Sequence, residues 1–176
     1  TNGTGKVSDK TLAELKSLTI DAGNNISLYP NLKIPTLEEY LYVCKKWGMV
    51  PVIEIKAANN TSDYDSLINL LKKLDFETKA IIISFNRTAL TEVRNRSKKI
   101  VLQLVTSSMT IDDLNFVKSL GNAMMDTYYT SATKENIELC HSNGILINTW
   151  SVDNFNTAKT LETNGIDFIT SNILCG

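Results

Sequence analysis

The stretch that most constrains the fold is the apolar run from Met49 to Ile53, which continues into Glu54, Ile55 and Lys56. An unbroken apolar run rich in β-branched residues is typical of a strand that helices cover on both faces of a parallel sheet. Side chains alternate along a strand, so Glu54 and Lys56 share one face. Charges on an interior face are costly unless something uses them. In a barrel they would lie at the carboxyl ends of the strands, where barrel enzymes keep their chemistry.

The rest of the chain repeats one unit, a helical pattern followed by a short apolar strand. Strands alternating with helices of about ten residues predict βαβ units and a parallel sheet. Together with the first stretch, six strands are readable, two fewer than a closed eight-stranded barrel needs. The expected helices span 64–74, 88–96, 110–118, 133–141 and 154–162, and the expected strands after the first span 80–85, 100–105, 123–126, 145–150 and 167–171.

Two further helices precede these units. Thr36 followed three residues later by Glu39 predicts a capping box, and Gly48 is suited to end that helix in the left-handed conformation. An earlier helix over residues 8–18 is expected to begin at a cap of Ser8 or Asp9.

The composition excludes several classes of protein. A net charge of -1 leaves no footprint for nucleic acid or an anionic membrane surface. No apolar run approaches the roughly 18–20 residues of a membrane span, so we expect a soluble protein, either cytoplasmic or secreted. Cys44, Cys140 and Cys175 are odd in number and widely spaced, which predicts free thiols rather than a disulfide framework or a zinc site.

Glu54 and Lys56 are the sharpest candidates for a site. A carboxylate suits a hard cation such as Mg²⁺ or Ca²⁺, and a nearby lysine suits a phosphoryl oxygen. Together they indicate metal-assisted chemistry on a phosphate ester. An ion pair that only closes the end of a strand is the structural alternative.

Other candidates are weaker. Trp150, at the end of its strand, could wall a substrate pocket or pack in the core. Gln103 is polar inside an apolar strand and needs a partner if buried. Phe85 ends its strand in a similar position. His141 is the only histidine and lies in the last turn of a helix, which favours a structural role at the carbonyl end of the helix dipole.

Five segments, in order and spacing, resemble the glycerophosphodiester phosphodiesterases. They are Ile34-Pro35-Thr36-Leu37-Glu38-Glu39, Ile53-Glu54-Ile55-Lys56, Ser84-Phe85, Thr149-Trp150-Ser151-Val152-Asp153 and Ile169-Thr170-Ser171-Asn172. The segment Thr1–Asp9 also resembles the one that follows a His-Asp motif in that family.

The resemblance implies a TIM barrel with a small insertion after its second strand, and hydrolysis of glycerophosphodiesters to glycerol 3-phosphate and an alcohol. It implies a small-molecule phosphodiester as substrate, a divalent cation (Mg²⁺ or Ca²⁺), and two histidines as general acid and base. Carried onto this chain, Glu54 is the metal ligand and Lys56 the catalytic lysine beside the phosphate. Trp150, with Phe85 and Gln103, is assigned to substrate binding.

Several family motifs have no counterpart here: the His-Arg-Gly of strand one, the Glu-x-Asp of strand two and the His-Asp of the insertion. On this resemblance residues 1–33 belong to the insertion, and residues 34–176 form a (β/α) barrel portion with strands three to eight of eight, the first two being absent. We therefore expect the chain alone to be inactive, with a second chain or copy completing the barrel. A degenerate barrel acting as a non-catalytic binding or structural module is the alternative, and a sphingomyelinase-D-like relative is another.

Overall fold

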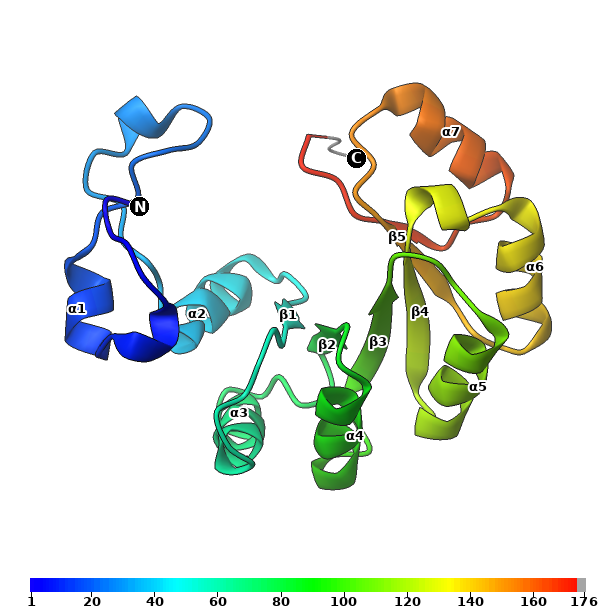
Figure 1. Ribbon diagram of the computed structural model, residues 1–176, viewed down its shortest axis with the longest axis horizontal. Coiled ribbons are helices and arrows are strands. Elements are labelled where there is room, and N and C mark those ends of the chain that lie inside the picture. Colours follow the sequence, from blue (N-terminus) through cyan, green and yellow to red (C-terminus); the bar gives the residue numbers. More distant parts are fainter. Residues whose placement is uncertain (174–176) are drawn as a thin grey trace. The chain divides into compact units, whose positions relative to one another are not determined.

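The computed structural model describes residues 1–173, which divide into two compact units, 1–49 and 50–173 (Figure 1). The boundary falls after Met49, so the helix that follows Thr36 belongs to the first unit. The assignment of residues 1–33 to a family insertion stays a prediction. Cys175 lies outside the described residues.

The first unit is made of short helices. They are η1 (Val7–Asp9), α1 (Leu12–Ser17), η2 (Ile26–Leu28) and α2 (Leu37–Trp47). In α2 the Thr36 hydroxyl accepts from the Glu39 N–H while the Glu39 carboxylate accepts from the Thr36 N–H, and Gly48 closes the helix at φ 65°. The predicted capping box and glycine stop are confirmed.

The cap expected for the earlier helix is wrong. Thr11, not Ser8 or Asp9, begins α1, because its hydroxyl accepts from the Glu14 N–H and the Glu14 carboxylate accepts from the Thr11 N–H. This reciprocal pair satisfies two main-chain donors that Ser8 or Asp9 would leave unpaired. Val7 to Asp9 form a separate turn of 3-10 helix.

The second unit is a parallel sheet of six strands in the order in which they occur in the sequence. The strands are β1 (Val52–Glu54), β2 (Ile81–Ser84), β3 (Val101–Thr106), β4 (Ala123–Tyr128), β5 (Ile147–Trp150) and β6 (Phe168–Ile169). The connecting helices are α3 (Ser62–Lys73), α4 (Arg87–Arg96), α5 (Ile111–Leu120), α6 (Lys134–Ser142) and α7 (Phe155–Thr163), with the 3-10 turn η3 (Tyr129–Ser131) before α6. This is the TIM-barrel type of α/β fold that the sequence predicts.

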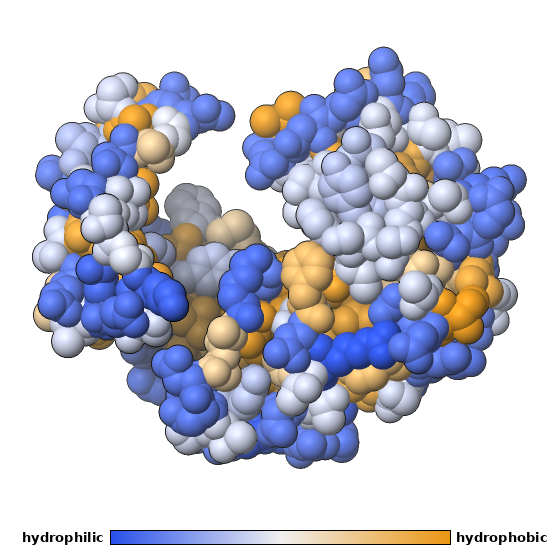
Figure 2. Space-filling model, viewed as in Figure 1, coloured by the Kyte–Doolittle hydropathy of each residue, from blue (hydrophilic) through white to orange (hydrophobic). Residues whose placement is uncertain are grey.

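The core of this unit lies between the sheet and its outer helices (Figure 1). Ile82, Leu102, Met125 and Ile147 are fully buried there, one from each of four adjacent strands. Each such side chain contributes about 1.5–3 kcal/mol through its removal from water. Figure 2 shows hydrophobic residues gathered over the strands, while the visible side of α4 is mainly hydrophilic.

The first strand departs from the expectation of burial on both faces. Val52 is 48% exposed, because β1 is the edge of the described sheet and pairs only with β2. Phe168, on the opposite edge strand β6, is 49% exposed for the same reason.

A buried arginine holds the amino ends of two strands. Arg94, at the end of α4, donates to the carbonyls of Ser97, Ile100 and Asn122, each at 3.0 Å. Burial lowers the pKa of this guanidinium. Three oriented carbonyls offset its desolvation, and the loops entering β3 and β4 are fixed in return.

Cys44 and Cys140 are buried free thiols, as expected from their spacing. Over residues 1–173, none of the helices combines the length and the hydropathy that crossing a membrane requires.

Candidate functional site

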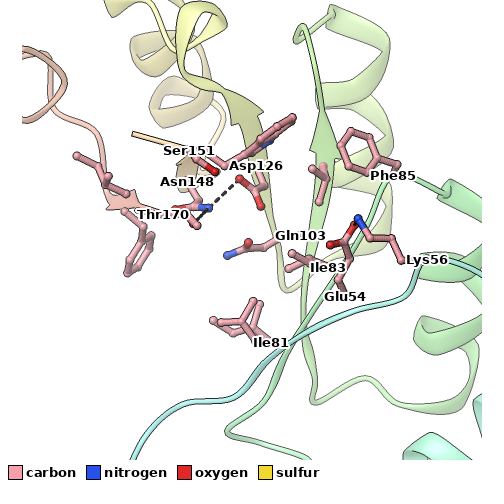
Figure 3. Close-up of a pocket in the computed structure, with 15 residues that line it drawn as sticks. Glu54, Lys56, Ile81, Ile83, Phe85, Gln103, Asp126, Asn148, Ser151 and Thr170 are labelled. Atoms are coloured by element: carbon pink, nitrogen blue, oxygen red, sulfur yellow. Dashed lines mark hydrogen bonds and ion pairs between the residues drawn. The ribbon is translucent and has the colours of Figure 1, made fainter. Parts of the chain in front are cut away.

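A cavity of about 470 Å³ opens on the inner face of the sheet (Figure 3). All five residues singled out from the sequence line it: Glu54, Lys56, Phe85, Gln103 and Trp150. They come from four different segments of the chain, so the fold brings together what the sequence separates. Their catalytic and binding roles stay predictions.

The strand register explains why these side chains meet. Glu54 lies beside Ile83, and Ile83 beside Gln103, so one row of the inner face carries a carboxylate and an amide. Neighbouring residues of an in-register parallel sheet point to the same face. The alternation that placed Glu54 and Lys56 on one face is confirmed, because both line the cavity.

Glu54 and Lys56 form an ion pair at the carboxyl end of β1. The Lys56 ammonium lies 2.5 Å from a carboxylate oxygen of Glu54. The Lys56 side chain is 76% exposed, which makes the pair a weak source of stability. Its nitrogen also lies 6.0 Å from the centre of the Phe85 ring, over the edge of the cavity. A mobile ammonium at a cavity mouth can bind an anionic oxygen without desolvating a buried charge.

Aromatic rings line one wall. Trp150 meets Phe85 edge-on, with ring centres 5.7 Å apart, and meets Tyr128 at 5.1 Å. The indole Nε1 of Trp150 is buried and has no hydrogen-bond partner within residues 1–173. A buried donor without a partner is costly to the fold.

The sequence reasoning missed Asp126, the one other carboxylate that lines the cavity. It is 3% exposed and accepts a hydrogen bond of 2.7 Å from the amide of Asn148, which donates a second one of 3.0 Å to Thr170. Burial raises the pKa of Asp126 to about 6, and the charge of Glu54 adds to the rise, while the Asn148 bond opposes it. Nearby Glu54 is thus close enough to act on Asp126 electrostatically.

The signal for Asp126 was present in the sequence. Met124 and Asp126 lie two residues apart in the strand and therefore share one face. A carboxylate on an interior face of the sheet follows from the same rule that placed Glu54. The strand is weakly marked in the sequence, because it is rich in methionine and lacks a run of β-branched residues.

His141 lies at the other end of the sheet. Its Nε2 is 2.9 Å from a carboxylate oxygen of Asp167, which also accepts from the main-chain N–H of Ile147 at the start of β5. Trp150 ends that strand, so His141 is separated from the cavity mouth by the strand's length. The geometry agrees with a structural role for this histidine.

The residues present do not by themselves form a site for a divalent cation. Within residues 1–173 there is no cluster of three or more histidine, cysteine, aspartate or glutamate side chains suited to a metal. Glu54 offers one carboxylate and already pairs with Lys56. Ca²⁺ takes about 6–8 oxygen ligands, so Glu54 can supply only part of such a set.

Comparison with known proteins adds the family. A family model described as the Glycerophosphoryl diester phosphodiesterase family matches residues 1–173. A glycerophosphodiester phosphodiesterase of Caldanaerobacter subterraneus is 28% identical over 96% of this chain and 70% of its own length. A Bacillus subtilis protein described as a putative glycerophosphodiester phosphodiesterase is 29% identical over 97% of this chain and 71% of its own length.

Solved structures agree on the fold. An Oleispira antarctica phosphodiesterase, solved in complex with the product sn-glycerol-3-phosphate, is 22% identical and superposes with a TM-score of 0.85. The match covers 97% of this chain and 70% of that one. Six parallel strands with alternating helices are therefore a partial barrel of the same type.

Proposed function

Because the chain belongs to the glycerophosphoryl diester phosphodiesterase family, we propose that its cavity binds glycerophosphodiesters for hydrolysis to glycerol 3-phosphate and an alcohol. The observation that carries this proposal is the position of Lys56. Its ammonium stands beside a carboxylate at the mouth of a cavity on the carboxyl side of a parallel sheet. Enzymes of this architecture keep their reacting groups at that end.

Lys56 is assigned to the phosphate. Its ammonium can donate to a non-bridging phosphoryl oxygen and stabilise the negative charge that develops there as the bond to the alcohol breaks. Trp150 and Phe85 form the wall against which the substrate lies.

Glu54 is proposed as one ligand of a divalent cation, Mg²⁺ or Ca²⁺. Its carboxylate suits either ion, and further ligands would have to complete the set. A cation bound there would supply a Lewis acid to the phosphoryl group. One carboxylate alone does not make a site for such an ion.

Proton transfer is the part that these residues do not supply. The family resemblance implies two histidines, whereas this sequence holds one, and His141 is bonded to Asp167 at the far end of the sheet. We therefore propose that the 176-residue chain by itself binds glycerophosphodiesters without turning them over. The non-catalytic binding module considered from the sequence would behave in the same way.

The open edges of the sheet favour a partner that completes the barrel. Val52 on β1 and Phe168 on β6 are half exposed, and each edge strand pairs on one side only among the described residues. Unpaired strand edges are ready to pair with another chain. We propose that a second chain or copy does so. Light scattering of the purified chain would detect a second copy as a mass above 19.6 kDa, and a different second chain would have to be added to raise the mass.

The phosphate assignment is tested by binding. Calorimetry with sn-glycerol 3-phosphate should show a roughly tenfold or greater loss of affinity for Lys56→Met, because a charge-assisted hydrogen bond is lost. Lys118→Met is the matched control, since Lys118 bonds to Asn143 away from the cavity. Equal affinities for Lys56→Met and the unaltered chain would contradict the assignment.

A second assay tests inactivity. Incubation of the chain with glycerophosphocholine and Mg²⁺ or Ca²⁺ should release glycerol 3-phosphate no faster than a blank. Release at the rate of an intact family enzyme would refute the proposal that proton transfer is missing.

A further inference from the structure

A row of polar side chains crosses the inner face of the sheet, and the phosphate assignment leaves it without a role. The polar strip, as we call it, consists of Gln103 on β3, Asp126 on β4, Asn148 on β5 and Thr170, the residue after β6. All four line the cavity (Figure 3). Burying polar groups on the face of a sheet costs free energy of folding, so the presence of four of them in one cavity calls for an explanation.

Asp126 is the centre of the strip, and only one of its two carboxylate oxygens has a hydrogen-bond partner among the described residues. One carboxylate oxygen accepts from the Asn148 amide at 2.7 Å. The other has no hydrogen-bond partner among the described residues, and Figure 3 shows it on the side toward Gln103. No cation pairs with Asp126 within residues 1–173, and the negative charge of Glu54 is nearby. A buried acceptor in this state is complementary to a ligand donor.

Asn148 and Thr170 orient Asp126. The Asn148 amide donates to both the Asp126 carboxylate and the Thr170 hydroxyl, so its two N–H groups fix its rotamer. In turn it holds the first oxygen of Asp126 and leaves the second facing the cavity. The arrangement is pre-organised, which reduces the entropy lost when a ligand binds.

Gln103 adds a donor beside this acceptor. It is 5% exposed, and its amide nitrogen has the Met124 sulfur at 3.7 Å, a weak acceptor. Gln103 pairs with Met124, two residues before Asp126 on the neighbouring strand. The strip therefore presents an amide donor and a carboxylate acceptor on adjacent strands, offset by two residues along the strand direction.

We propose that the polar strip binds the hydroxyl groups of the glycerol unit, with Asp126 as the main specificity-determining residue. This inference rests on the proposed function, in which Lys56 binds the adjoining phosphate. A hydroxyl both donates and accepts, so it can donate to Asp126 while accepting from Gln103. An ammonium group has donors only and would leave the Gln103 amide without an acceptor. Two neighbouring hydroxyls, as in glycerol, match the strip better than a cationic alcohol.

The test compares three ligands on the 176-residue chain: sn-glycerol 3-phosphate, 3-hydroxypropyl phosphate, which lacks the middle hydroxyl, and inorganic phosphate. Trp150 fluorescence reports binding once Trp47→Phe removes the other tryptophan, which lies in the first unit. Asp126→Asn retains the size and an oxygen for the Asn148 bond but puts a donor where the free acceptor was. Asp112→Asn is the matched control, because Asp112 is exposed on α5 outside the cavity.

We expect sn-glycerol 3-phosphate to bind about tenfold more tightly than 3-hydroxypropyl phosphate, because a hydrogen bond to a charged acceptor is lost in the analogue. Asp126→Asn should abolish this preference without weakening the binding of inorganic phosphate, because loss of a nearby negative charge does not disfavour an anion. Asp112→Asn should keep the preference.

Equal affinity for all three ligands, or a preference that survives Asp126→Asn, would overturn the role of the strip and leave the phosphate assignment standing. Failure of all three ligands to bind would overturn both.

Discussion

Replacement of Asp126 by asparagine should stabilise the protein at neutral pH. The carboxylate is buried, accepts one hydrogen bond and faces the charge of Glu54, so its ionised form is disfavoured in the folded state. Its pKa is about 6 when folded, against 3.8 for the ordinary group. Each unit is equivalent to about 1.36 kcal/mol, so ionised Asp126 costs the fold up to about 3 kcal/mol.

The sign follows from proton binding. Between these two pKa values the folded chain retains a proton that the unfolded chain has lost, so the free energy of unfolding falls as pH rises. This contribution of Asp126 is fully present below about pH 4 and lost above about pH 6. The gain from Asp126→Asn relative to the unaltered chain should therefore grow by about 2 kcal/mol between pH 4.5 and 7.5.

Urea unfolding followed by Trp150 fluorescence in the Trp47→Phe background measures this difference. Taking the difference between variants at each pH cancels the other titrating groups. Met124→Leu, which exchanges neutral side chains two residues before Asp126 on β4, should change stability by a constant amount over the range. A gain from Asp126→Asn that does not vary with pH would refute the argument, because burial would then not be acting on the carboxylate's ionisation.

Three further predictions concern positions away from that carboxylate. Arg94→Met should lower the free energy of unfolding by about 3 kcal/mol, since three main-chain carbonyls lose a buried cationic donor. A loss below about 1 kcal/mol in urea unfolding would argue against this role of Arg94. Thr110→Ala should cost about 1 kcal/mol through loss of the capping box with Asp113, and Thr110→Ser should restore most of it. His141→Gln should leave the calorimetric affinity for sn-glycerol 3-phosphate unchanged, and a severalfold loss would place the histidine in the site.

Periodicity and strand alternation predicted the parallel α/β fold well, because they follow from backbone geometry alone. Helices and strands lie within a few residues of the expected positions, and the capping box at Thr36 was readable from its two residues. What failed depended on neighbours in space. The exposure of Val52 depends on β1 being an edge strand, which the sequence does not reveal. The cap at Thr11 competed with two equally good candidates nearby, Ser8 and Asp9.

The candidate site shows the same division. Each of the five candidate residues is suggested by its own position on a strand, and the strand register brings them to one cavity. They are Glu54, Lys56, Phe85, Gln103 and Trp150. The polar strip cannot be recognised from the sequence, because its residues come together only when the strands pair. Its members lie about twenty residues apart in sequence, and hydrogen bonds such as that between Asn148 and Asp126 appear only once the strands pair.

A role in ligand binding would explain why this domain keeps a destabilising carboxylate. Ionised Asp126 costs stability at neutral pH, and a ligand hydroxyl that donates to it would offset that cost on binding. Stability and recognition are thus linked through one residue. Ligand should raise the unfolding midpoint of the unaltered chain more than that of Asp126→Asn.

The most direct measurement is a crystal structure of the chain soaked with sn-glycerol 3-phosphate. The phosphate should lie within about 3 Å of the Lys56 ammonium nitrogen. The glycerol hydroxyls should face the free oxygen of Asp126. A ligand bound outside the cavity, or one with its phosphate turned away from Lys56, would contradict the assignment of this face of the sheet to glycerophosphodiesters.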